Sequence, residues 1–241
     1  MGATEFFCTV KSFRMLTPTV FETTFEAAKA QPEHPDFQFE AGQFVSIVIP
    51  GAGPKGRDLR RAYSIASGPL QRPVELCVKL VEGGPGTNYL YKLREGDVFR
   101  GFAPYGDFVY EPKPGRSACF VATGTGIAPF RAMLHSQAYK DAPPAHTWCL
   151  MGVRGDEELC YHDELSRYEG LHWVTAVTGA SEEYRGYRGR VTDWLRARDE
   201  SFPWKETDFY LCGNGAMITE VQALLAEKGV EKDSIHKEKY Y

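Results

Sequence analysis

The sequence predicts two folded domains of different class, an antiparallel β-barrel over residues 1–112 and an α/β domain with a parallel sheet over residues 113–241. The first half consists mainly of short β-branched and aromatic stretches separated by glycine and proline, which is typical of antiparallel sheets. The second half alternates strand-like and helix-like stretches, the pattern of a parallel sheet with helices on both faces. Residues 111–115 carry two prolines and a glycine and fit a linker between the domains.

Six strands are expected in the first half, because each candidate is short, rich in β-branched or aromatic residues, and bounded by turn residues. They are residues 6–13, 20–25, 43–49, 62–66, 74–81 and 98–102. One helix, over residues 87–93, interrupts them. Short strands in this arrangement predict a small closed antiparallel barrel.

Strands and helices are expected to alternate in the second half. The strands are residues 118–122, 147–151, 171–176, 208–211 and 234–239. The helices are residues 129–137, 157–168, 191–197 and 216–227. Ligands of such sheets bind beyond the carboxyl ends of the strands. Gly124, Gly152 and Cys212 fall at such ends, so we expect ligand-binding residues along this edge.

The composition is that of a globular protein and excludes several functional classes. Hydrophobic residues make up 43% of the 241 residues, charged residues make up 25%, and the net charge of −4 does not favour nucleic-acid binding. No apolar run approaches the roughly 18 residues that a membrane-spanning helix needs. An early acid, Glu5, and the lack of a basic-then-apolar stretch argue against a secretion signal.

The six cysteines lack the spacing of a metal or iron–sulfur site, and most lie in apolar, strand-like stretches. We therefore expect buried free thiols, which fit a reducing compartment and a cytoplasmic protein. His162 stands beside Asp163 and Glu164, but we expect this trio on the surface of a helix and expect no metal site.

A glycine turn links the first expected strand of the second domain to the helix that follows. The turn is Thr123-Gly124-Thr125-Gly126, and Pro129 suits the first turn of the helix. Glycines let the backbone approach a ligand closely, and the free N–H groups of a helix start attract an anion such as a pyrophosphate. A purely structural turn would use the same glycines, so this motif alone leaves both interpretations open.

Three further motifs accompany the glycine turn: Arg61-Ala62-Tyr63-Ser64, Gly83-Gly84-Pro85-Gly86-Thr87 and Tyr210-Leu211-Cys212-Gly213-Asn214-Gly215. The sequence then ends with Glu238-Lys239-Tyr240-Tyr241. In this order and spacing, the set resembles the ferredoxin–NADP reductase family of flavoenzymes, from about Gln43 to the last residue. The resemblance implies that the barrel binds FAD and that the parallel-sheet domain binds NAD(P)H.

The resemblance also implies which residues contact the flavin. They are Arg61, Ala62, Tyr63, Ser64, Gly84, Gly86 and Thr87. Arg61 would hold the pyrophosphate, Tyr63 would pack on the flavin, and Ser64 would reach its reactive N5 atom. Thr87 would make a second phosphate contact at a helix start. The residues alone leave this open, because an exposed Arg and a core Tyr on a strand, and a plain helix cap, would look the same.

At the nucleotide site, the family's contacts match Thr123, Gly124, Thr125, Gly126, Pro129 and Gly213. Cys212 would lie against the nicotinamide ring, where it would contribute shape and polarisability and not a thiolate. Glu238 would supply a carboxylate there, so Ser64, Cys212 and Glu238 are the expected catalytic residues. Tyr240 matches an aromatic on the flavin face, and Tyr241 stands one residue beyond; which of the two stacks on the flavin stays open.

The residues do not decide between NADH and NADPH, although they lean toward NADH. Arg154 follows the second strand, where an arginine can accommodate a 2′-phosphate, and Arg190 matches another contact of the family. Members that prefer NADPH usually carry Ser-Arg after the third strand, where this chain has Thr178-Gly179. Asp156 and the two glutamates after it would repel a phosphate.

The expected reaction is hydride transfer from NAD(P)H to FAD, followed by delivery of single electrons to a separate protein. That acceptor would be a ferredoxin, a flavodoxin or an oxygenase component, and we expect the chain to act as a monomer. Two alternatives remain open. One is a reductase of free flavin or ferric complexes, and the other is a non-catalytic electron-transfer subunit of a larger complex.

Overall fold

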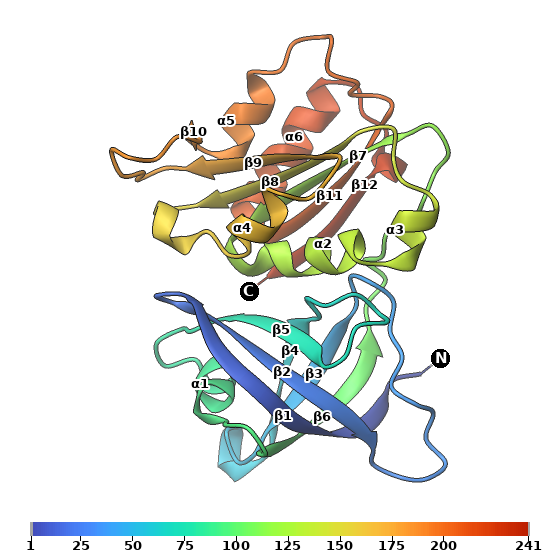
Figure 1. Ribbon diagram of the computed structural model, residues 1–241, viewed down its shortest axis with the longest axis vertical. Coiled ribbons are helices and arrows are strands. Elements are labelled where there is room, and N and C mark those ends of the chain that lie inside the picture. Colours follow the sequence, from blue (N-terminus) through green and yellow to red (C-terminus); the bar gives the residue numbers. More distant parts are fainter. Residues whose placement is uncertain (1, 241) are drawn as a thin grey trace. The chain divides into compact units, whose positions relative to one another are not determined.

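The computed structural model describes residues 2–240. The chain divides into two compact units, which are described separately below (Figure 1). The first unit comprises Met1–Tyr110 together with Ala128–Lys140, and the second comprises Glu111–Ile127 together with Asp141–Tyr241. The chain therefore leaves the first unit, starts the second, and returns to the first before completing the second.

The first unit contains a six-stranded antiparallel sheet in the order β4-β3-β6-β1-β2-β5 (Figure 1). Its strands are β1 (Thr4–Thr17), β2 (Val20–Lys29), β3 (Phe44–Ile49), β4 (Leu59–Ser64), β5 (Val74–Lys79) and β6 (Val98–Tyr105). The two outer strands meet where Ile65 bridges Leu76, and the Ala66 N–H donates to the Glu75 carbonyl at 2.8 Å. The sheet thus closes on itself just after β4, as a barrel does.

Aromatic side chains fill the barrel. Phe25 and Phe99 meet edge to face with ring centroids 5.3 Å apart, and Phe6 meets Phe37 in the same way at 5.0 Å. Helix α1 (Pro85–Lys92) contributes Leu90, which is fully buried in this core. The helix is therefore held at one place on the barrel by the burial of its apolar side chain.

Two helices that follow the glycine turn pack on the barrel. They are α2 (Ile127–Leu134) and α3 (Gln137–Asp141). Phe130 lies against Phe108 with ring centroids 5.9 Å apart, and Tyr139 lies against Tyr110 at 5.5 Å. At Gly68 a Cβ would come within 2.7 Å of the His135 carbonyl oxygen, so glycine is required for this close approach.

The second unit contains a six-stranded parallel sheet in the order β10-β9-β8-β7-β11-β12 (Figure 1). Its strands are β7 (Ser117–Thr123), β8 (Thr147–Val153), β9 (Leu171–Val177), β10 (Tyr187–Arg188), β11 (Thr207–Asn214) and β12 (Ile235–Tyr240). From β7 the strand order runs outward in both directions. The topological switch point, beside which such sheets bind ligands, therefore lies between β7 and β11.

Helices α5 (Val191–Arg196) and α6 (Gly215–Glu227) lie against the apolar side chains of one face of this sheet (Figure 1). Their contacts with β7, β8 and β11 form a continuous buried core. The remaining helix is α4 (His162–Leu165), and short 3₁₀ turns cover Pro54–Gly56, Gly124–Gly126, Asp156–Glu158 and Lys232–Ser234. Among the helices of residues 2–240, none has the length and apolar character needed to cross a bilayer.

The predicted fold class is confirmed, since an antiparallel barrel-like sheet and a parallel sheet are both present. Two helix predictions are wrong in extent. The helix expected over 157–168 is a 3₁₀ turn and the four-residue α4, because Tyr161 adopts a left-handed conformation (φ 56°) between them. The helix expected over 129–137 ends at Leu134, where Ser136 Oγ donates to the Met133 carbonyl and accepts from the Tyr139 N–H.

Candidate functional site

In the first unit, the motif on β4 and the start of α1 lie against each other. A Cβ built on Gly86 would come within 2.3 Å of Tyr63 Oη and 3.0 Å of Arg61 Cγ. Only glycine allows this approach, which brings together two motifs separated by more than twenty residues of sequence. The aliphatic part of the Arg61 side chain is thus next to the N-terminus of α1.

The N-terminus of α1 is open to an anion. Its N-cap, Gly84, has no side chain to satisfy the first N–H groups, and the first hydrogen bond within the helix runs from Asn88 N–H to the Gly84 carbonyl at 3.0 Å. The N–H groups of Gly86 and Thr87 precede this bond and have no partner inside the helix. The Thr87 hydroxyl is 3.2 Å from the Val81 N–H, which it accepts, and so braces the preceding loop.

Arg60 and Arg61 differ in what they bind. Arg60 donates to Ser46 Oγ at 3.0 Å and to Tyr105 Oη at 2.8 Å, and its guanidinium lies 4.1 Å from the Phe102 ring centroid. Within residues 2–240, the Arg61 side chain donates only to the neighbouring backbone carbonyl of Arg60. Arg60 is therefore part of the barrel surface, whereas Arg61 can turn toward a ligand at α1.

The other two residues of the β4 motif have contrasting environments. Ala62 is exposed and pairs with Ser46, whereas Ser64 is buried at the end of β4, directly before the barrel closes. Tyr63 packs on the barrel core. Burial raises the pKa of Tyr63 to about 12, against an opposing effect of Arg61, so the phenol is neutral at physiological pH.

In the second unit, the glycine turn and the end of β11 pack together at the switch point. A Cβ on Gly126 would lie 2.3 Å from the Cys212 carbonyl oxygen, and one on Gly213 would lie 2.3 Å from Thr123 Oγ1. Thr123 Oγ1 also accepts the Asn214 N–H at 2.8 Å. Thr123, the turn that follows it, and Cys212–Gly213 therefore form one compact corner at the carboxyl edge of the sheet.

Cys212 is fully buried in this corner and pairs in register with Glu238 on β12. Burial raises the pKa of the thiol well above its ordinary range, and the nearby carboxylate of Glu238 raises it further. The Tyr240 side chain hydrogen-bonds to the thiol and opposes this shift in pKa only in part. Cys212 is therefore a neutral thiol, which agrees with a role in shape and not in nucleophilic attack.

The loops after β8 and β9 are tied to each other at the same edge of the sheet. Asp156 accepts the Ser181 N–H and the Ser181 hydroxyl, each at 2.8 Å. These two hydrogen bonds lower the pKa of Asp156, so its carboxylate is charged. Sequence reasoning placed Asp156 near the nucleotide but missed its fixed position, because its partner lies 25 residues away.

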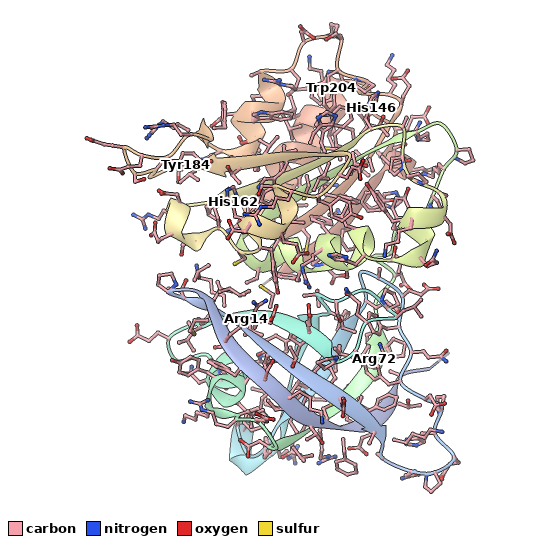
Figure 2. The ribbon with its side chains drawn as sticks, in the orientation of Figure 1. Arg14, Arg72, His146, His162, Tyr184 and Trp204 are labelled. Atoms are coloured by element: carbon pink, nitrogen blue, oxygen red, sulfur yellow. The ribbon has the colours of Figure 1, made fainter. Side chains whose placement is uncertain are left out.

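The arginines near these loops differ in their hydrogen-bond and ion-pair partners. Arg188 donates to the backbone carbonyls of Ala180 and Ser181, and its guanidinium lies over Tyr184, which is labelled in Figure 2. Arg154 is exposed and no side-chain bond to it is described among residues 2–240. Arg190 caps α5 and lies 3.9 Å from Glu220. Of these three arginines, Arg154 is thus the one whose side chain has the fewest described bonds.

The expected site residues fall into one group in each unit. The group in the first unit contains Arg61, Ala62, Tyr63, Ser64, Gly84, Gly86 and Thr87. The group at the carboxyl edge of the second contains Thr123, Gly124, Thr125, Gly126, Cys212, Gly213, Glu238 and Tyr240, with Arg154 and Arg190 on neighbouring loops. Pro129 lies on α2, which packs with the first unit, and Tyr241 lies outside the described residues. Asn214 was not expected at the site, although it caps α6 at the same edge of the sheet. An asparagine followed by glycine just before a helix is a recognisable N-cap pattern, so the sequence could have identified it.

Comparison with known proteins gives matches to both units. Two family models match, an oxidoreductase FAD-binding domain over residues 19–110 and an oxidoreductase NAD-binding domain over residues 120–223. The ferredoxin–NADP reductase B of Sorangium cellulosum is 35% identical over 237 residues, which cover 94% of each chain. The reductase component of phenol 2-monooxygenase from a Pseudomonas species is 31% identical over 213 residues, covering 84% of this chain and 58% of that protein.

Solved structures show the same arrangement of elements. A ferredoxin–NADP⁺ reductase from Neisseria gonorrhoeae, solved with bound FAD and NADP, superposes with a TM-score of 0.83 at 23% identity, and the match covers 100% of both chains. At this identity the likeness shows the fold alone. The similarity in sequence is shown by the two reductases from Sorangium and Pseudomonas.

Proposed function

Because this chain belongs to the ferredoxin–NADP reductase family of FAD- and NAD-binding oxidoreductases, we propose that it transfers a hydride from a reduced nicotinamide nucleotide to FAD and then passes single electrons to a separate protein. The observation that carries the proposal is the close approach of Arg61 and Tyr63 to the N-terminus of α1. It places an arginine side chain beside an uncapped helix N-terminus, which is the chemistry that a pyrophosphate needs, on a barrel of the FAD-binding family.

The residues of the first unit fit FAD. Arg61 and the N–H groups of Gly86 and Thr87 would bind its pyrophosphate, since guanidinium and helix N-termini both favour phosphate oxygens. The missing Cβ of Gly86 leaves the space that this contact requires. Tyr63, neutral because its pKa is raised, would present an uncharged ring to the flavin. Bound FAD supplies an acceptor for two electrons that can release them one at a time.

Ser64 and Cys212 are assigned to the reacting atoms. The Ser64 hydroxyl, buried at the end of β4, would hydrogen-bond to flavin N5 and so act where bonding changes during reaction. Cys212, as a neutral thiol, would pack against the nicotinamide ring and exclude water. Glu238, in register with Cys212, would orient the carboxamide side of the nicotinamide. Tyr240, which hydrogen-bonds to Cys212, would cover the flavin face until the nucleotide arrives.

Thr123, the glycine turn through Gly126, and Gly213 would hold the pyrophosphate of the nucleotide, because they lie at the topological switch point. Pro129 lies in the first turn of the helix that follows. We propose NADH as the preferred nucleotide. The support is the fixed, charged carboxylate of Asp156, which disfavours a 2′-phosphate. Arg154 stands where an arginine can accommodate such a phosphate, so the proposal requires that Asp156 outweighs it, and Arg190 would make a further contact with the nucleotide.

We further propose that the functional domains divide near residues 112 and 113. The protein would act as a monomer in the cytoplasm. Its electron acceptor would be a ferredoxin, a flavodoxin or an oxygenase component. Support for the acceptor class comes from the names of the relatives, which include a ferredoxin–NADP reductase and a monooxygenase reductase component. Rates of electron transfer to purified ferredoxin, flavodoxin and free FMN would rank these acceptors. Gel filtration would measure the mass of the assembly.

The decisive experiment measures flavin content and flavin reduction. The purified protein should be yellow with about one FAD per chain, and stopped-flow mixing with NADH should bleach it. Ser64→Ala should keep FAD but slow the bleaching on the order of tenfold or more, since it removes an interaction made in the transition state.

The matched control is Ser12→Ala on β1 of the same barrel, because the Ser12 hydroxyl hydrogen-bonds to Thr24 Oγ1 at 2.8 Å and has no assigned place at the flavin or at the barrel closure. Ser12→Ala should lower the melting temperature without slowing reduction. A colourless protein that FAD cannot reconstitute would rule out the proposed function.

A further inference from the structure

Arg131 is a buried, charged residue that no step of the proposed reaction uses. It lies on α2, it is 7% exposed, and it belongs to the same unit as the barrel. Guanidinium does not lose its charge in a protein, so its burial requires partners that compensate the lost hydration. The identity of those partners indicates what Arg131 does.

The two described partners of Arg131 stand at the closure of the barrel. Arg131 Nη1 donates to the Ala66 carbonyl at 2.9 Å and forms a short ion pair with Glu75 Oε2 on β5. Ala66 and Glu75 are also bonded to each other through the backbone. The guanidinium therefore holds the point where the chain leaving β4 joins β5, two residues beyond Ser64.

The same helix is continuous with the nucleotide turn. Helix α2 begins at Ile127, which follows the turn Gly124–Gly126 directly. Gly126 in turn packs on the backbone of Cys212 with no room for a Cβ. Three residues of helix separate Ile127 from Arg131, so the anchor at Arg131 lies about one helical turn from the first residue of α2.

An ion pair suits this task better than an apolar contact. A buried ion pair contributes little net stability over a well-packed apolar pair, but it imposes direction and register. Both bonds come from one guanidinium nitrogen, Nη1, whose two hydrogens have directions fixed in the guanidinium plane, whereas the hydrogens of a lysine ammonium rotate freely. Apolar contacts such as Phe130 on Phe108 would permit sliding that this bond geometry prevents.

We propose that Arg131, paired with Glu75, is a positioning residue that fixes helix α2 to the barrel closure and, through Ala66, fixes the position of Ser64 at the end of β4. This inference rests on the proposed function, since that function assigns Ser64 to flavin N5. A shift of about 1 Å between reacting groups can slow a reaction on the order of 100-fold. A residue that does not touch the reacting atoms can therefore still control the rate by fixing the position of one that does.

The test compares Arg131→Met and Arg131→Lys in the FAD-loaded protein. Hydrogen–deuterium exchange should show protection of the α2 amides and of the Ala66 amide falling at least tenfold in Arg131→Met. Stopped-flow reduction at saturating NADH should slow at least tenfold, while the affinity for NAD⁺ changes less than threefold. Arg131→Lys should give intermediate values, because the charge remains and the fixed donor directions are lost.

The matched control is Arg116→Met, which breaks a comparable ion pair, Arg116 Nε to Asp208 Oδ2 at 2.8 Å, in the other unit. This control should lower the melting temperature and leave α2 protection and the reduction rate unchanged. If Arg131→Met does not fold, Glu75→Gln removes only the partner's charge and should show the same pattern more weakly.

Unchanged α2 protection and an unchanged rate in a folded variant would overturn the positioning role. A rate that falls only in proportion to lost FAD would overturn it as well. A wild-type protein that neither NADH nor NADPH reduces would instead refute the proposed function. The exchange measurement would still decide the role of Arg131 in that case.

Discussion

Two adjacent arginines on β4, Arg60 and Arg61, differ in role: one stabilises the barrel and the other is available to a ligand. Arg60 is committed to Ser46, Tyr105 and the Phe102 ring, so it stabilises the barrel surface. Arg61 has one backbone partner and lies beside the open start of α1. Residue type and exposure are the same for both, and only their contacts separate them.

Arg61→Ala should therefore weaken FAD binding. Losing a charge-assisted hydrogen bond to a phosphate costs on the order of 1.5–3 kcal/mol, roughly a ten- to 150-fold rise in Kd. Fluorescence titration of the flavin-free protein with FAD measures this. Arg60→Ala is the control, and it should lower the melting temperature with little effect on Kd; the reverse result would mean that the wrong arginine is assigned.

Asp156→Asn should raise the use of NADPH relative to NADH. Removing a negative charge from the edge where a 2′-phosphate would bind relieves a repulsion, so the kcat/KM ratio of NADPH to NADH should rise severalfold. The Ser181 hydrogen bonds lower the pKa of Asp156, so the charge that causes selectivity should persist as the pH falls through the usual range of an aspartate.

The control for this variant is Glu157→Gln, which changes the net charge equally on an exposed neighbour that Ser181 does not hold. Steady-state kinetics with both nucleotides, at low and at high ionic strength, separates a local effect from a general one. An equal shift in both variants would show that net charge near the loop, and not the fixed carboxylate, sets the preference.

At the scale of elements, the contact of α1 with β4 depends on the absence of one methyl group. Gly86→Ala should push the helix start away from β4, because the new Cβ would lie 2.3 Å from Tyr63 Oη. FAD affinity should fall, as measured by titration of the flavin-free protein. In the double variant Tyr63→Phe/Gly86→Ala the clashing hydroxyl is gone, so affinity should recover in part; no recovery would mean that the clash is not what weakens binding.

The sequence predicts these elements well where the signal is local. The strand ends and the glycine turn carry their own pattern, so the corner formed by Thr123 and Gly213 could be anticipated from β7 and β11 alone. The break at Ser136 depends on one side chain competing for backbone groups, which periodicity does not detect. The pair of Arg131 and Glu75 could not be predicted, because 56 residues separate partners that only the closed barrel brings together.

At the scale of the whole molecule, the two packed units do not correspond to two continuous stretches of the chain. Residues 128–140 belong by packing to the unit formed by the first 110 residues, although the second unit has begun by then. The expected division near residue 112 therefore describes the sequence motifs, whereas the packing of the barrel extends to α3. A functional domain and a folding unit need not have the same boundaries.

A fragment of residues 1–112 should for this reason be unstable. It lacks the helices that cover Gly68, Phe108 and Tyr110, and it leaves Glu75 without Arg131. Circular dichroism should show a melting temperature well below that of the full chain, and FAD titration should show weaker binding. A fragment that melts cooperatively at the temperature of the full chain and binds FAD equally well would show that α2 and α3 add nothing to the barrel.

The double passage of the chain between units has a consequence for its synthesis on the ribosome. All six barrel strands emerge first, but the unit is complete only after the 30 further residues from Glu111 to Lys140 have been added. At roughly 5–20 residues per second, this takes between about 1.5 and 6 s. During that interval the nascent barrel exposes the apolar surface that α2 and α3 later cover. Translation speed over this stretch, and chaperones near the tunnel exit, therefore bear on the yield of folded protein.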